Sequence, residues 1–228
     1  MVADLIEEAV VQLLRDAVTA LPPDVVDALR RAEARETSEV ARSQLRIILD
    51  NIDAAGRLAV PMCQDTGVHV FYVTGPVDAS VEESIRSGVA RATEEIPLRP
   101  NAVHPLTREN PGTNVAVGLP HIIYYPTDED FLEITVLPKG AGSENMTALA
   151  MLAPADGIDG VKRFVLDTVV KAGGRPCPPT IVGVGIGGTS DLAVSMAKEA
   201  LLRPLDLPNA DPGLAALELS FRCGHGHQ

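Results

Sequence analysis

The change from helical to alternating hydrophobic periodicity constrains the fold of this chain more than any other feature. A long helical stretch ends at residues 58–61, which read Leu-Ala-Val-Pro, and residues 68–72 then alternate as a strand does. Between them, residues 62–67 read Met-Cys-Gln-Asp-Thr-Gly, so a thiol, an amide and a carboxylate lie where a helix gives way to a strand. A cysteine that only fills a core needs no polar neighbours. Gln64 and Asp65 therefore favour a ligand site around the thiol.

The composition is that of an ordinary soluble protein, and the charge disfavours several classes of partner. The 228 residues, 46% of them hydrophobic and 22% charged, can bury the core of one domain. A net charge of −12 disfavours nucleic acid and anionic membranes, which bind clustered Lys and Arg. No apolar run approaches the roughly 20 residues that cross a bilayer. The acidic, amphipathic N-terminus does not match a signal peptide, so we expect a cytoplasmic location, where three widely separated cysteines stay reduced.

The pattern of apolar residues predicts an α+β (mixed α/β) fold in which N-terminal helices pack on a mixed sheet within a single domain. The third helix is expected to follow an N-cap at Ser38 and to bury Val40, Leu45, Ile48 and Ile52. Helices are predicted at residues 3–21, 25–35, after 38, 81–96, 143–152, 161–172 and 189–202. Strands are predicted after residue 67 and at residues 121–125, 131–137 and 180–186. The acidic loop at residues 126–130 favours a hairpin between the second and third strands.

A second polar cluster is a glycine-rich turn between a strand and a helix at residues 137–147. Such a turn exposes backbone N–H groups beside a helix N-terminus, where anions are favoured. We expect Ser143 to cap the helix while Lys139 and Asn145 face a ligand. The alternative is a well-capped connection that needs small residues only for close packing.

A third cluster surrounds Cys177, which has prolines on both sides that stiffen its backbone. Residues 183–188 then match G-x-G-x-x-G between a predicted strand and helix. A dinucleotide site would need a second strand after that helix, but residues 203–212 are proline-rich and not strand-like. We therefore expect these glycines to form an anion-accepting or tightly packed turn.

The C-terminus carries a further candidate metal site, since residues 223–227 read Cys-Gly-His-Gly-His. Structural zinc sites usually pair two sets of ligands, so we interpret this tail as an adventitious binder. His69, His104 and His121 are isolated in the sequence and are interpreted as structural histidines.

Three motifs in this order resemble one known family. Residues 63–67, residues 139–145 and residues 177–189 are similar to those of the α subunit, or N-terminal catalytic domain, of iron–sulfur-dependent class I fumarate hydratases and L-tartrate dehydratases. The segment at residues 96–103 also resembles that family. The resemblance extends from the N-terminal helices to about Arg203.

The resemblance implies a [4Fe–4S] cluster held by three cysteines, with one iron open to substrate as a Lewis acid. Cys63 and Cys177 would be two of the ligands. Gln64 and Asp65 would contact substrate, and Asp65 would take part in catalysis. The Arg99 guanidinium would pair with a substrate carboxylate, and the backbone around Gly140 would supply N–H donors. The family's remaining substrate-binding residues belong to a β-type partner, so an oligomer is expected and the chain alone would be incomplete.

One departure concerns the third cluster cysteine, which in the family lies several dozen residues beyond the glycine motif. From the sequence we expect residues 1–228 to form an α-type hydro-lyase domain that lacks its C-terminal part, or Cys223 to replace the missing ligand. The function implied is reversible addition or removal of water on a small dicarboxylic acid, fumarate and malate or else tartrate. The alternatives are a non-catalytic subunit that packs with a partner without a cluster, and zinc binding by the tail.

Overall fold

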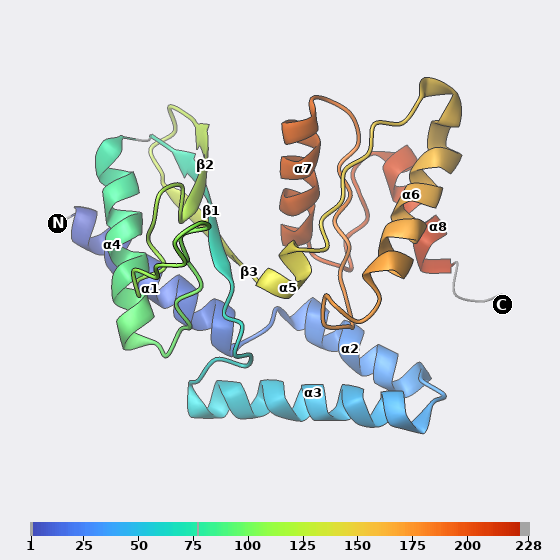
Figure 1. Ribbon diagram of the computed structural model, residues 1–228, viewed down its shortest axis with the longest axis horizontal. Helices are drawn as coiled ribbons and strands as arrows, with labels where there is room; N and C mark the ends of the chain where they lie inside the picture. Colours follow the sequence, from blue (N-terminus) through green and yellow to red (C-terminus); the bar gives the residue numbers. More distant parts are fainter. Residues whose placement is uncertain (1, 77, 224–228) are drawn as a thin grey trace. The chain divides into compact units, whose positions relative to one another are not determined.

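The chain folds into two compact units, Met1–Glu144 and Asn145–Gln228, and combines helices with one small sheet (Figure 1). The computed structural model describes residues 2–76 and 78–223. Of these, Arg222 and Cys223 are described by their main chain alone. The predicted α+β class and mixed sheet are confirmed. Each unit is described by itself below.

The first unit begins with three helices in the places that the sequence predicts. They are α1 (Val2–Thr19), α2 (Pro23–Arg35) and α3 (Glu39–Leu58). Ser38 caps α3 as expected, because its side chain accepts a hydrogen bond from the Ala41 N–H at 3.4 Å. The predicted buried face of α3 is wrong in part: Ile52 is buried, but Val40 is 74% exposed. Its apolar residues therefore do not all serve the core.

The sheet of the first unit has three strands in the order β2-β1-β3. They are β1 (Val68–Gly75), β2 (His121–Pro126) and β3 (Glu133–Lys139). The central strand β1 is parallel to β2 and antiparallel to β3. The predicted β2–β3 hairpin is therefore wrong. β1 is buried on both faces, and a strand of that kind takes the middle of a sheet and separates its neighbours.

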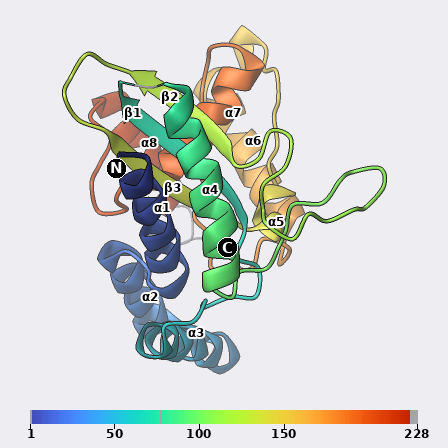
Figure 2. The ribbon, with the colours of Figure 1, turned by 90° about the vertical axis from the view of Figure 1, so that its left-hand side faces the viewer.

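Two helices cover one face of this sheet. The helix α4 (Ala79–Glu95) connects the parallel strands β1 and β2, and its Asp78 cap accepts hydrogen bonds from Ser80 and Val81. Figure 2 shows α1 and α4 side by side in front of the strands. Phe71 and Val73 of β1 project into the core that these helices close. The fully buried helix residues of this core include Val10, Leu14, Ile85, Val89 and Ala92.

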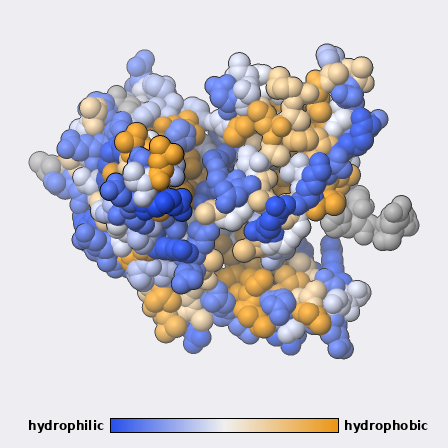
Figure 3. Space-filling view, in the orientation of Figure 1, coloured by the Kyte–Doolittle hydropathy of each residue, from blue (hydrophilic) through white to orange (hydrophobic). Residues whose placement is uncertain are grey.

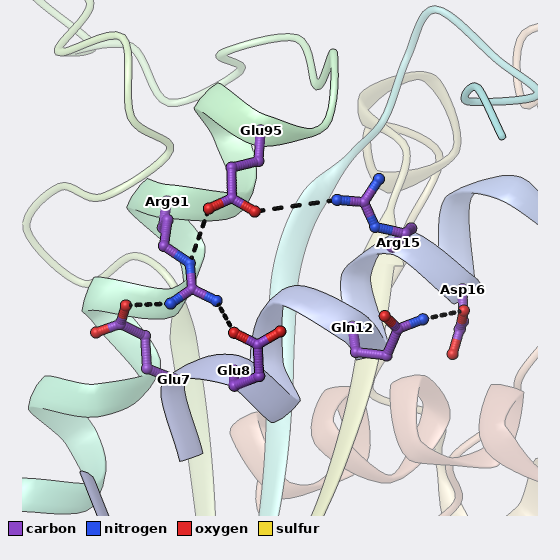
Figure 4. A network of polar contacts seen from close by, with 7 residues as sticks. All are labelled: Glu7, Glu8, Gln12, Arg15, Asp16, Arg91 and Glu95. Atoms are coloured by element: carbon purple, nitrogen blue, oxygen red, sulfur yellow. Dashed lines mark hydrogen bonds and ion pairs between the residues drawn. The ribbon is translucent and has the colours of Figure 1, made fainter. Parts of the chain in front are cut away.

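An arginine joins α1 to α4 at the edge of this core (Figure 4). The Arg91 guanidinium donates hydrogen bonds to Glu7 at 2.7 Å and Glu8 at 2.5 Å, and Glu95 lies 3.1 Å from its Nε. Hydrogen bonding to Glu8, with the charges of Glu8 and Glu95, raises the pKa of Arg91 above its ordinary value. Arg15 adds a 4.0 Å contact to Glu95. These ion pairs add contacts between the two helices outside their apolar core.

The second unit is made of helices and extended segments. Its elements are the 3₁₀ turn η1 (Pro154–Asp156), α6 (Gly157–Ala172), α7 (Ser190–Glu199), the 3₁₀ turn η2 (Ala200–Leu202) and α8 (Pro212–Cys223). The predicted helices at residues 161–172 and 189–202 are confirmed. The helix α8 was not predicted.

Two sequence predictions fail in this part of the chain. The helix predicted at residues 143–152 is reduced to the four residues of α5 (Ala141–Glu144), which belongs to the first unit. Residues 180–186 are extended, but no strand pairs with them among the residues that the structure describes. Both segments are apolar, yet most of their side chains are exposed, and a periodic pattern needs a packed face to become regular structure. Figure 3 shows hydrophobic residues exposed at several places on the surface.

Within residues 2–76 and 78–223, no helix combines the length and the hydropathy that a membrane span requires.

Candidate functional site

The Cys63 loop follows α3 and is held by hydrogen bonds at Met62. Ala59 ends α3 in the left-handed conformation, with φ of 52°. The next turn is tied down at Met62, whose N–H donates to the Val18 carbonyl at 2.9 Å and whose carbonyl accepts from Asn51 Nδ2 at 2.8 Å. Cys63 and Gln64 follow and are both exposed. The local fold therefore presents a free thiol and an amide to solvent from a fixed base.

Gly67 closes the same loop against the end of β3. Its φ is +84°, and a Cβ at this position would lie 2.8 Å from the Lys139 backbone nitrogen. Only glycine meets both conditions at low cost, because a side chain would be strained and would collide with backbone. This close approach brings the Cys63 loop beside the turn that follows β3.

Asp65 connects three separate stretches of the first unit. Its Oδ2 accepts a hydrogen bond from the Ala141 N–H at 2.8 Å and a longer one from Gly142 at 3.5 Å. Its Oδ1 accepts from the Gly67 N–H at 3.2 Å and from Asn101 Nδ2 at 3.4 Å. The carboxylate is thus held in one orientation by N–H donors from the loop, the glycine turn and the segment after α4.

The turn at Gly140 uses its polar groups internally. Lys139 Nζ donates to Ser143 Oγ at 2.5 Å and lies 3.7 Å from Glu144. Ser143 Oγ donates in turn to the Gly140 carbonyl at 3.0 Å. The sequence predicted N–H donors around Gly140, and the nearest of these, on Ala141, donates to Asp65.

Arg99 is held by its backbone and presents its side chain to solvent. Its N–H donates to Thr66 Oγ1 at 3.0 Å, and its carbonyl accepts from Asn114 Nδ2 at 3.1 Å. The guanidinium is exposed, and no carboxylate pairs with it in the described part of the chain. A cation of this kind can bind an anionic ligand without first breaking an ion pair.

The Cys177 loop lies in the second unit and is built differently. It follows α6, where Arg175 Nε donates to the Ala172 carbonyl at 3.1 Å. Cys177 is exposed, and its N–H donates to the Gly174 carbonyl at 3.3 Å. Its φ is +59°, a conformation that costs a residue with a side chain about 1 kcal/mol or more. The thiol is therefore presented by a strained backbone.

The glycines after Cys177 serve packing. A Cβ on Gly183 would lie 2.0 Å from the Ala197 carbonyl oxygen, and one on Gly185 would lie 2.1 Å from that of Ala193. Both carbonyls belong to α7, so the extended segment lies directly against the helix backbone. Of the two predicted alternatives, the tightly packed turn is the one that this contact supports.

The predicted site residues fall into two groups. The first unit contains Cys63, Gln64, Asp65, Arg99 and Gly140, and Asp65 accepts hydrogen bonds from three stretches of that unit. Cys177 belongs to the second unit. Among the described residues, no three Cys, His, Asp or Glu side chains form a metal-binding group. The tail at residues 224–228 lies outside the described residues, as does the Cys223 side chain.

The donor chemistry fits an iron–sulfur cluster, although it does not by itself complete a site. Both described thiols are free and exposed, and thiolates are the soft ligands that iron–sulfur clusters require. Their loops reach solvent, where an inorganic cluster can be inserted without opening the core.

Sequence reasoning missed two asparagines and could not show the surroundings of His69. Asn101 and Asn114 hold the segment after α4, but a loop asparagine gives no signal in hydrophobic periodicity. His69 is 1% exposed, and neither ring nitrogen has a hydrogen-bond partner among the described residues. Burial lowers the pKa of His69 to about 4. The interpretation of His69 as structural is compatible with a neutral imidazole in the core.

Comparison with known proteins gives the family. A family model described as fumarate hydratase (fumerase) matches residues 7–222. The chain is 48% identical, over 222 residues, to a putative L(+)-tartrate dehydratase subunit alpha of Methanocaldococcus jannaschii, covering 93% of this chain and 78% of that protein.

Two more distant relatives agree. The chain is 33% identical to the L(+)-tartrate dehydratase subunit alpha of Escherichia coli strain K12, covering 90% of this chain and 70% of that protein. It is 34% identical to a putative class I fumarate hydratase of Geobacillus stearothermophilus, covering 92% of this chain and 43% of that protein. The chain therefore belongs to the fumarate hydratase family of hydro-lyases.

Proposed function

We propose that this chain is the α-type subunit of a hydro-lyase that reversibly adds water to, or removes it from, a small dicarboxylic acid. Fumarate with malate is the first candidate pair and tartrate the second. The observation that carries the proposal is the set of hydrogen bonds around Asp65, which joins the Cys63 loop, the segment at Arg99 and the turn at Gly140. Relatives named for the same two reactions support it.

Cys63 and Cys177 would be ligands of a [4Fe–4S] cluster. An iron without a protein ligand would supply Lewis acidity to a C–OH group or to water. Both thiols are exposed and carry no competing bond, which supports this assignment. We place the reaction in the cytoplasm, where thiols stay reduced. A third ligand is needed, and Cys223 is one candidate for it.

The other predicted residues would bind and orient the diacid. The Arg99 guanidinium suits a substrate carboxylate, because a planar fork can make two parallel hydrogen bonds to it. The Gln64 amide is exposed beside Cys63 and can donate to the second carboxylate or to a hydroxyl. The Gly140 turn would close the site on the other side of Asp65.

Asp65 would contact substrate and take part in proton transfer. Its two oxygens accept N–H donors that fix the plane of the carboxylate, so a lone pair not used by these donors has a defined direction. During dehydration a carbon-bound proton and a hydroxide leave, and together they make one water. Preorganised polar groups of this kind are effective because they need little rearrangement as charge develops.

A β-type subunit would supply the remaining substrate contacts. Two of the relatives are named as subunits alpha, which supports a heteromeric assembly. Arg99 and Gln64 are exposed in this chain and could face such a partner across the substrate.

The test is an anaerobic assay of the chain co-expressed with a β-type hydro-lyase subunit. After reconstitution with iron and sulfide, we expect hydration of fumarate or dehydration of L-tartrate, and loss of activity in air. Asp65→Asn should lower kcat about 100-fold or more while iron content stays unchanged. A colourless complex with freely titratable thiols and no turnover of either diacid would contradict the proposal and favour a non-catalytic packing subunit.

A further inference from the structure

We propose that Asn101 is a positioning residue that sets the orientation of Asp65, and that Asn114 holds Asn101 in place. The inference rests on the proposed function, because it assigns a role relative to the Asp65 carboxylate. It goes further by assigning roles to two asparagines that are not among the predicted site residues.

Asn101 spans the gap between Asp65 and the start of β1. Its Nδ2 lies 3.0 Å from the Gly67 carbonyl oxygen and 3.4 Å from Asp65 Oδ1. One amide group therefore holds both the carboxylate and the backbone that follows it. The Ala141 N–H holds the other carboxylate oxygen from the opposite side. With donors on both oxygens, rotation of the carboxylate about its χ2 angle is restrained.

Asn114 anchors the backbone of Asn101 to the protein core. It is 4% exposed, and its φ of +57° is a conformation that asparagine tolerates better than most residues. Its Oδ1 accepts from the backbone N–H of Asn101 at 2.6 Å and of Ala102 at 3.3 Å. Its Nδ2 donates to Thr93 Oγ1 at 3.2 Å and to the Arg99 carbonyl at 3.1 Å.

The Asn114 side chain thus uses both of its donors and both of its acceptor positions. Fully satisfied buried polar groups rigidify their surroundings, whereas partly satisfied ones are costly. The contacts form a continuous path from Thr93 on α4, through Asn114 and Asn101, to Asp65. Through this path the helix core determines where the carboxylate points.

The experiment compares Asn101→Ala with a matched control in the same loop. Asn110 also holds this segment, since its Nδ2 donates to the Pro100 carbonyl at 2.7 Å, but it is exposed and does not bond Asp65. In the reconstituted complex, Asn101→Ala should lower kcat about 10- to 100-fold and change KM less than about threefold. Asn110→Ala should change both by less than about twofold.

A double-mutant cycle separates positioning from simple loss of stability. If Asn101 acts through Asp65, then adding Asn101→Ala to Asp65→Asn should cost less than about threefold more in kcat. Equal losses in both backgrounds, or an unchanged kcat in Asn101→Ala, would overturn the proposal. Should Asn101→Ala fail to fold, Asn101→Leu keeps nearly the same side-chain shape and removes the N–H donors without adding a charge, and the same criteria apply.

A second measurement does not depend on activity. In the isolated chain, amide hydrogen exchange at Ala141 reports whether Asp65 still accepts its N–H. We expect exchange about tenfold faster in Asn101→Ala and unchanged in Asn110→Ala. Unchanged exchange at Ala141 in Asn101→Ala would overturn the positioning role. A wild-type complex that turns over neither diacid would instead refute the proposed function, while the exchange result would still decide the role of Asn101.

Discussion

The two loops that carry the proposed cluster ligands are built in opposite ways. The Cys63 loop, in the first unit, is fixed by side-chain hydrogen bonds and by close backbone contact at Gly67. The Cys177 loop, in the second unit, has one backbone hydrogen bond at its cysteine and a strained φ. The first loop is therefore preorganised by the fold, whereas the second would gain most from the bonds that a cluster supplies.

The same contrast extends to the cores of the two units. Nearly all the fully buried apolar side chains lie in the first unit, around α1, α4 and β1. In the second unit only Val165 and Ala172 are comparably buried hydrophobic residues in the described part of the chain. Since burial of apolar area is the main favourable term in folding, the first unit should provide most of the stability.

The largest loss of stability is expected for Leu14→Ala, and the matched substitution at Leu166 tests the contrast between the two cores. Leu14→Ala in α1 removes a side chain with no exposure and should lower the free energy of unfolding by about 2–5 kcal/mol. The same change at Leu166 in α6, which is 52% exposed, should cost less than about 0.5 kcal/mol. Chemical denaturation of both variants measures the difference. Equal losses would show that the second unit depends on a core of its own.

Acid should destabilise the first unit through His69. Burial lowers its pKa to about 4 in the folded chain, from an ordinary value of 6.5. Above pH 6.5 both states are neutral and stability is complete. As the pH falls from 6.5 towards 4, only the unfolded state binds the proton, so about 3 kcal/mol is lost.

The measurement is the free energy of unfolding between pH 7 and pH 4.5. His69→Leu should reduce the pH dependence of this free energy. A wild-type curve as flat as that of His69→Leu would contradict the burial of a neutral imidazole.

Gly185→Ala tests the close contact between the extended segment at residues 180–186 and α7 in the second unit. Its Cβ would lie 2.1 Å from the Ala193 carbonyl oxygen, so the segment and α7 must separate, at a cost of about 1–3 kcal/mol. Gly174→Ala, with no atom within 4 Å of the new Cβ, is the control and should be nearly neutral. Thermal unfolding compares the two variants. Equal melting temperatures would mean that the segment does not lie against α7 in solution.

The smallest effect concerns the α1–α4 ion pairs of the first unit. Arg91→Met keeps much of the aliphatic length and removes the charge that binds Glu7, Glu8 and Glu95. Because these groups are partly solvated, we expect Tm to fall by only a few degrees, and less at high salt. A salt-independent loss of the same size would point to packing in place of charge.

The sequence predicts the elements of the first unit well, because their apolar spacing is also their buried face. The helices α1 and α4 are examples, as is the Ser38 cap. The order of the strands was not predictable from acidic turn residues alone, since pairing depends on which strand is buried on both faces. The extended residues 180–186 read as a strand because their apolar character is real, but a strand also needs a partner.

The candidate site, like the fold, could be predicted from the sequence only in part. Cys63, Gln64 and Asp65 are adjacent in the sequence, and their chemistry is visible there. The contact of Asp65 with Ala141 joins residues 76 positions apart and follows from the fold. Asn114 acts through a left-handed backbone conformation and a buried amide, neither of which a single sequence displays.

The most direct test of the account is iron and sulfide content after anaerobic reconstitution of the wild type and of Cys63→Ser, Cys177→Ser and Cys223→Ser. We predict a brown wild-type protein with iron and acid-labile sulfide in equal amounts, and loss of about 90% or more of both in Cys63→Ser and in Cys177→Ser. The Cys223→Ser variant decides whether the third ligand is that thiol. Full iron content in either of the first two variants would contradict the claim that these two loops hold one cluster.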